Sequence, residues 1–138
     1  MAETKEKAPR SDAQIEAEVQ RVLHSYPPLV HDRHRLTITV NDGMLKVSGY
    51  VKSVPTYHYL RENLTRIEGV REVDANELYD DENIRRDVGQ VVPYGVQVIV
   101  EYGAVILAGQ LNEDAAVEDL VRKVALVPGV HRVLTTFS

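Results

Sequence analysis

Hydrophobic positions along this chain follow a helix–strand–strand–helix–strand order that occurs twice. In the first half, apolar residues recur at helical spacing after Ser11, at Ile15, Val19, Val22, Leu23 and Tyr26. Leu36, Ile38 and Val40 then alternate with polar residues, which indicates a half-buried strand. A second apolar stripe predicts a helix over 54–68, and residues 70–78 form the third strand.

Short motifs set the boundaries of these elements. Ser11 and Gln14 have the spacing of a capping box, which predicts a helix start. Pro27 and Pro28 end that helix, because proline cannot donate to the helical hydrogen-bond ladder. A two-residue turn at Asp42-Gly43 would place Val40 opposite Leu45, Ile38 opposite Val47 and Leu36 opposite Gly49.

The second half repeats this order. Asp80 or Asp81 opens a helix that ends at Pro93, strands lie on both sides of Tyr102-Gly103, a helix covers 113–127 and a strand covers 130–137. The predicted fold class is therefore α+β, with two tandem α-β-β-α-β units, each a three-stranded sheet with two helices on one face. We assign residues 1–10 to a disordered tail, 11–79 to the first unit and 80–138 to the second.

The two halves align without a gap from Leu36 and Val96 onward, at a constant separation of 60 positions. The identical residues are all apolar or glycine, so the repeat conserves core positions and backbone geometry but no polar side chain. Six glycines are predicted to be structural: Gly43 and Gly103 in turns, Gly69 and Gly129 at helix ends, and Gly49 and Gly109 where helix and sheet approach closely. This pattern favours a binding or assembly module over an enzyme.

Composition narrows the function further. A net charge of -5 disfavours general nucleic-acid binding, and the absence of cysteine excludes thiolate metal sites and disulfides. No cofactor or catalytic motif is recognisable. His31, Asp32 and His34 lie in the longer loop of the first unit, which is interpreted as polar surface rather than a metal site. No transmembrane segment or signal peptide is recognisable in the sequence, so we expect a cytoplasmic location, or a periplasmic one if a leader was removed.

The outward strand face differs between the two halves. Thr39 and Lys46 are paired there in the first unit, whereas Ile99 and Ile106 are paired in the second, beside Ala104 and Ala108. An exposed apolar patch of this kind predicts an interface, covered either by the first unit or by a second chain in a homo-oligomer. The alternative is a β-branched preference without function.

The motifs VNDGMLKVSG and VEYGAVILAG, each followed by a helix and then by GVREV or GVHRV, resemble the BON family in its tandem two-domain form. The resemblance covers residues 11–138. It implies binding to phospholipid or a membrane surface, a role in envelope maintenance and osmotic stress, and no catalytic site. It also implies that a helix of the second domain is the membrane contact.

Arg85 and Arg86 lie on that helix and are the candidate lipid contacts, although nearby acids favour an ordinary solvated face. Two functional hypotheses follow. The first is a non-enzymatic tandem module that contacts anionic phospholipid headgroups and is linked to stress or envelope maintenance. The alternative is a cytoplasmic protein–protein assembly or adaptor module without lipid affinity.

Overall fold

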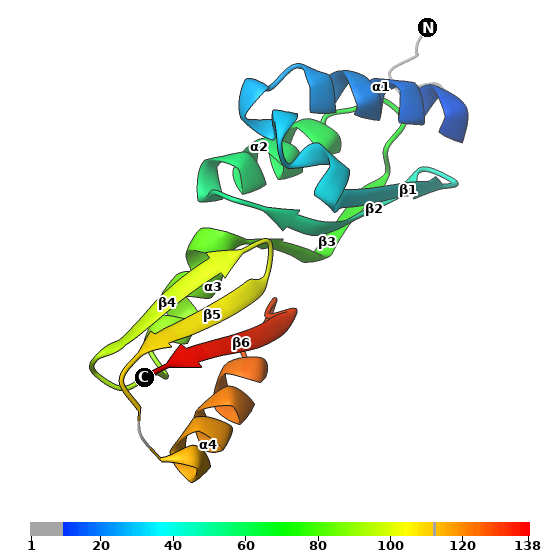
Figure 1. Ribbon diagram of the computed structural model, residues 1–138. Helices are drawn as coiled ribbons and strands as arrows, with labels where there is room; N and C mark the ends of the chain where they lie inside the picture. Colours follow the sequence, from blue (N-terminus) through cyan, green and yellow to red (C-terminus); the bar gives the residue numbers. More distant parts are fainter. Residues whose placement is uncertain (1–9, 112) are drawn as a thin grey trace, which may run out of the picture. The chain divides into compact units, whose positions relative to one another are not determined.

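The computed structural model describes residues 10–111 and 113–138, which form two units of the same design (Figure 1). The first comprises residues 10–51 and 55–78, and the second comprises residues 52–54 and 79–138. The tail predicted for residues 1–10 lies outside the described residues except for Arg10. The Arg10 guanidinium donates to the Glu68 carbonyl oxygen at 3.3 Å.

The first unit begins with α1 (Asp12–His24), and two short 3-10 turns (Pro27–Val30 and Arg33–Arg35) connect it to the sheet. The remaining elements are β1 (Leu36–Asn41), β2 (Met44–Val51), α2 (Val54–Thr65) and β3 (Glu72–Asp80), with β2 in the middle of the sheet. Ser11 and Gln14 form the predicted capping box. The predicted register of β1 and β2 is confirmed, because Val40 lies opposite Leu45 and Ile38 opposite Val47.

The second unit consists of α3 (Asp81–Gly89), β4 (Val96–Glu101), β5 (Ala104–Gly109), α4 (Asp114–Ala125) and β6 (Arg132–Phe137). Strand β5 is central; it pairs with β4 in antiparallel and with β6 in parallel orientation. Asp80 is the N-cap of α3. The predicted α+β class and the tandem α-β-β-α-β order are therefore confirmed.

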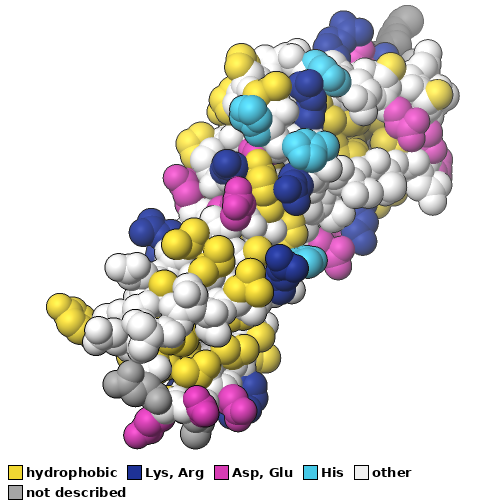
Figure 2. All heavy atoms as spheres, in the orientation of Figure 1, with side chains coloured by type: hydrophobic (Ala, Val, Ile, Leu, Met, Phe, Trp, Pro, Cys, Tyr) yellow, Lys and Arg dark blue, Asp and Glu magenta, His cyan; other side chains and the backbone are white. Residues whose placement is uncertain are grey.

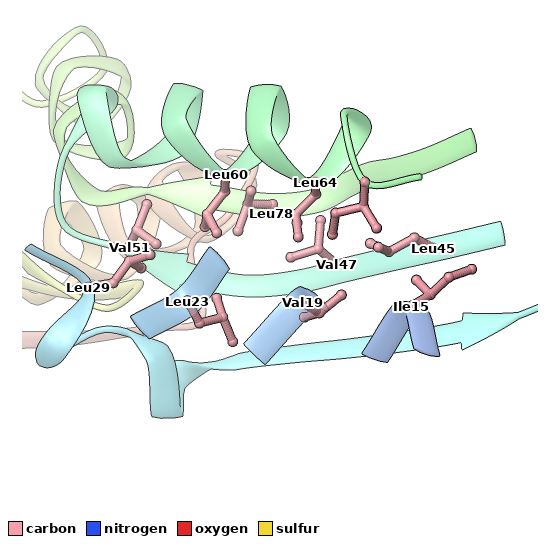
Figure 3. Packing of buried hydrophobic residues seen from close by; sticks show 11 residues of the cluster. Ile15, Val19, Leu23, Leu29, Leu45, Val47, Val51, Leu60, Leu64 and Leu78 are labelled. Atoms are coloured by element: carbon pink, nitrogen blue, oxygen red, sulfur yellow. The ribbon is translucent and has the colours of Figure 1, made fainter. Parts of the chain in front are cut away.

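Both helices of the first unit cover one face of its sheet. Leu45, Val47 and Val51 project from that face of β2 into a cluster of eleven buried residues drawn from α1, α2 and the strands (Figure 3). Leu29, in the longer connection after α1, is fully buried in the same core. The corresponding connection of the second unit is shorter. Among the described residues of that unit, the buried apolar set is smaller: Ile84, Val88, Val105, Leu107, Leu120 and Val124.

The hairpin turns have the expected geometry, but the structure differs from the roles predicted for the glycines outside these turns. Asp42 and Gly43 have φ of 55° and 80°, and Tyr102 and Gly103 have 48° and 83°, as a two-residue turn of this type requires. Gly49, in contrast, does not face α1 or α2: a Cβ there would collide with the carbonyl oxygen of Arg35, which ends the second 3-10 turn just before β1. Gly109 has the same relation to Gly95.

Gly69 and Gly129 do not end helices. Helix α2 ends at Thr65 and α4 at Ala125, several residues before each glycine. Both glycines lie instead in separate turns, closed by bonds of 3.1 Å from Val70 N to Ile67 O and from Val130 N to Val127 O. Their φ values of 97° and 91° let the chain turn sharply into the last strand of each unit. Helix α3 also ends early, at Gly89, which leaves Val91 and Val92 outside it.

Candidate interaction surface

The face of the second sheet opposite α3 and α4 is a grid of nine side chains. Strand alternation places every second residue of β4, β5 and β6 on this open face. The strand register then orders them into three rows that run across the sheet. The rows are Gln97–Ala108–Thr136, Ile99–Ile106–Leu134 and Glu101–Ala104–Arg132.

The central row is apolar and exposed. Ile99 exposes 51% of its surface and Leu134 exposes 43%, while Ile106 is half-buried between them. Ala104 and Ala108 are half-buried on either side of Ile106. Figure 2 shows hydrophobic side chains gathered on the part of the molecule that holds β4, β5 and β6. The four residues predicted from the sequence thus share one face, and Leu134 completes the row.

The first unit has a polar surface at the equivalent place. Thr39 lies opposite Lys46, whose amino group is 3.4 Å from the carboxylate of Glu77. Asp74 stands 60 positions before Leu134. Because the two sheets share one scaffold, the apolar row is a property of the second unit's side chains and not of the fold.

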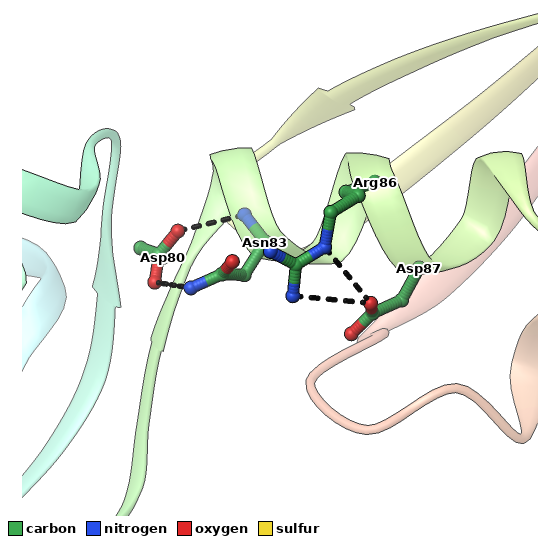
Figure 4. A network of polar contacts seen from close by, with 4 residues as sticks. All are labelled: Asp80, Asn83, Arg86 and Asp87. Atoms are coloured by element: carbon green, nitrogen blue, oxygen red, sulfur yellow. Dashed lines mark hydrogen bonds and ion pairs between the residues drawn. The ribbon is translucent and has the colours of Figure 1, made fainter.

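Arg85 and Arg86 lie on α3 and have different surroundings. Figure 4 shows Arg86 beside Asp87. The Arg86 side chain is 66% exposed, and its Nε lies 3.4 Å from an oxygen of Asp87. Arg85 Nε donates to the Val98 carbonyl oxygen of β4 at 3.3 Å. Asp80 accepts from the backbone and side-chain nitrogens of Asn83 at 2.7 and 2.8 Å. Asp80 thus caps the N-terminus of α3.

Asp81 contacts the hairpin turn between β4 and β5. Its carboxylate accepts from the backbone N–H groups of Tyr102 and Gly103 at 2.7 and 3.1 Å, and the residue is 7% exposed. Asp12 makes the same contacts to Asp42 and Gly43 at 2.9 and 3.2 Å. The expectation that the repeat conserves no polar side chain is therefore wrong at the start of each unit. The alignment from Leu36 missed this pair because the longer connection of the first unit shifts it out of phase.

A groove of about 1200 Å³ lies between α3 and the edge strand β4. Arg85, Arg86 and Tyr94 line it together with the acids Glu82 and Glu101. Tyr94 is fully exposed, and Val91, in the same connection, is 40% exposed. The groove thus presents basic side chains and an exposed aromatic ring, but acidic side chains also line it.

The loop of His31, Asp32 and His34 is less exposed than expected. Asp32 is 2% exposed, so the interpretation as a polar surface loop is wrong for this residue. Over residues 10–111 and 113–138, no three side chains of the metal-binding types lie close enough to hold an ion. Within the same ranges, no helix has the length and apolar character needed to cross a membrane.

The fold is a tandem pair of α+β units. The family model for the BON domain matches residues 11–78 and 80–136, and the chain belongs to the BON domain family. A search of curated proteins finds no match.

Two solved structures share the fold. Both are of CdsD, described as a structural protein of the type III secretion system of Chlamydia trachomatis. One is 15% identical with a TM-score of 0.72, and the match covers 93% of this chain and 63% of that one. The other, a C-terminal domain, is 16% identical with a TM-score of 0.73, and covers 94% and 68%.

Proposed function

We propose that this protein is a non-enzymatic assembly module that binds a protein partner through the open sheet face of its second unit. The observation that carries the proposal is the row of Ile99, Ile106 and Leu134, exposed where the first unit has Thr39 and Lys46. Exposing apolar side chains to water is unfavourable in free energy, and polar side chains at these positions would avoid that cost. An exposed apolar row is therefore best explained by a partner that covers it.

The comparisons support a binding role in general terms. BON domains are generally non-catalytic binding domains, and the chain consists of two of them. CdsD is a structural protein of a secretion assembly, and a structural part in a larger assembly is consistent with an exposed sheet face. Because the likeness to CdsD is one of fold alone, it does not identify a partner for our protein. The partner must be inferred from the surface of this chain.

The proposal can be tested by photo-crosslinking in the native host. A benzophenone amino acid would replace Leu134, at the exposed end of the apolar row. The matched control carries the same probe at Glu118, an exposed position on α4. We expect a discrete protein adduct from position 134 that is absent from position 118. Equal labelling from both positions, or no protein adduct from 134, would contradict the proposal.

A second candidate function is contact with anionic phospholipid headgroups, linked to envelope maintenance or stress. The observation that favours it is the groove beside α3, where Arg85 and Arg86 are exposed near the fully exposed Tyr94. Basic and aromatic side chains together suit the interface between headgroups and acyl chains.

Liposome co-sedimentation separates the two candidates. Binding of the wild type to anionic but not neutral vesicles at low salt, lost on Arg85→Glu with Arg86→Glu, would support headgroup contact. The matched control is Arg122→Glu with Lys123→Glu, which makes the same charge change on α4, where both cations pair with Asp119. The absence of binding at low salt would remove this candidate.

A further inference from the structure

The open face of the second unit is complementary to itself. We propose that it binds the same face of a second copy of this chain, through a two-fold axis that lies between the sheets and runs along β5. This inference rests on the proposed assembly function and names its partner.

The strand register determines what such an axis brings together. A rotation about a line along β5 keeps each row over its own counterpart and exchanges the two edge strands. In the central row, Ile99 then faces Leu134 of the second copy, and Ile106 faces its own counterpart. Side chains of two sheets packed face to face interdigitate in this way at a separation of about 10 Å.

The row nearest the hairpin turn adds charge complementarity. Glu101 and Arg132 stand at its two ends, with Ala104 between them. Both residues are exposed, and within the described part of the chain neither side chain forms an ion pair or a hydrogen bond. The two-fold places each Glu101 over the Arg132 of the other copy, so the dimer gains two ion pairs. The usual rotation of about 30° between packed sheets displaces these ends by only about 5 Å, which long side chains can span.

Other arrangements of the same two faces lose this match. A two-fold axis across the strands would place Glu101 and Arg132 over the row of Gln97 and Thr136. The four charged groups would then lack ionic partners while the apolar area buried stayed the same. Charge therefore selects the axis along β5 over the axis across it.

The size of the face sets the expected strength. Three strands spaced about 4.8 Å apart, each six residues long, cover roughly 300 Å² in projection. A standard stable interface buries about 800 Å² per partner, so the dimer is weak and forms on the order of 10⁻⁴ M. Assembly measurements must therefore use protein concentrations of up to roughly several hundred micromolar.

Charge exchange between two variants tests the geometry. Glu101→Arg alone places arginine over Arg132 of the second copy, and Arg132→Glu alone places glutamate over Glu101. Each variant by itself should associate about tenfold or more weakly than the wild type in sedimentation equilibrium, because like charges oppose at both ends. Mixed in equal amounts, the two variants should form a heterodimer, since every facing pair is again of opposite sign. Unfolding midpoints in dilute solution verify that both variants are folded.

The outcomes distinguish this inference from the function on which it rests. Recovery of the dimer in the mixture supports the two-fold, and equal association of wild type, single variants and mixture overturns it. A wild type that stays monomeric at several hundred micromolar also overturns the self-association, in the concentration range estimated above. The crosslink from position 134 then decides the function separately: an adduct with a different protein preserves the assembly module, and the absence of any protein adduct removes both.

Discussion

Replacing Ile99 with threonine gives the second unit the side chain that the first unit has at the same position, Thr39. The substitution preserves β-branching and shape, so the strand itself is little perturbed. Ile99 is 51% exposed, so about half of the roughly 1.5–3 kcal/mol for full burial of such a side chain remains to be gained on assembly.

Because a two-fold dimer buries this residue twice, Ile99→Thr should cost the assembly about 1.5–3 kcal/mol, or roughly tenfold to over a hundredfold in dissociation constant. The free energy of unfolding in dilute solution should change by less than about 1 kcal/mol, because the side chain is half exposed in the free chain.

Sedimentation equilibrium and urea unfolding measure the two quantities. Gln97→Thr, on the same strand but outside the apolar row, is the matched control and should leave both nearly unchanged. Unchanged self-association of Ile99→Thr would refute the assignment of the face. A loss of monomer stability as large as that of a core deletion would show instead that the residue is covered within its own chain.

Three further predictions concern the scaffold. Asp81→Ala removes the acceptor for two hairpin N–H groups and should lower the free energy of unfolding by about 1.5–3 kcal/mol, measured in urea, whereas an unchanged value would mean that water replaces the carboxylate. Gly109→Ala should cost more than about 1 kcal/mol in the same assay, because its φ of 119° and the nearby Gly95 carbonyl both oppose a Cβ; a neutral effect would contradict that geometry. Burial, and secondarily Tyr26, raises the pKa of Tyr59 above the usual value of about 10 for tyrosine. The neutral phenol therefore stabilises the folded protein at pH values below about 10, and this stabilisation is lost as the pH rises through the raised pKa of the folded state. Tyr59→Phe should therefore flatten the decline of stability between about pH 9 and 11, and an equally steep decline would disprove the assignment to this residue.

The sequence was sufficient where a local motif determines geometry. The Asp42-Gly43 turn fixes the hairpin register, and that register places Ile99, Ile106 and the two alanines on one face of the second sheet. Leu134 was not predicted because a parallel strand pairs across a long connection, whose turn does not fix its register.

Other features depend on contacts that local patterns do not encode. Asp12 and Asp81 accept hydrogen bonds from hairpins that are distant in sequence. Aspartate is common at helix starts because it caps the helix, so its presence there does not by itself indicate a contact with a hairpin. Helix ends were predicted too late because apolar spacing continues through Ile67 and Val127, which lie in turns beyond the helices. The burial of Asp32 likewise depends on packing in the longer connection.

The most direct test of the central claim compares the wild type with Ile99→Thr combined with Ile106→Lys, which gives the second sheet the outward pair of the first. Sedimentation equilibrium over increasing concentration measures the mass of each. We predict that the wild-type mass rises from 15.5 kDa toward twice that value, while the variant remains at 15.5 kDa. Equal masses for the two proteins at every concentration would contradict the claim that this face is an interaction surface between copies of the chain.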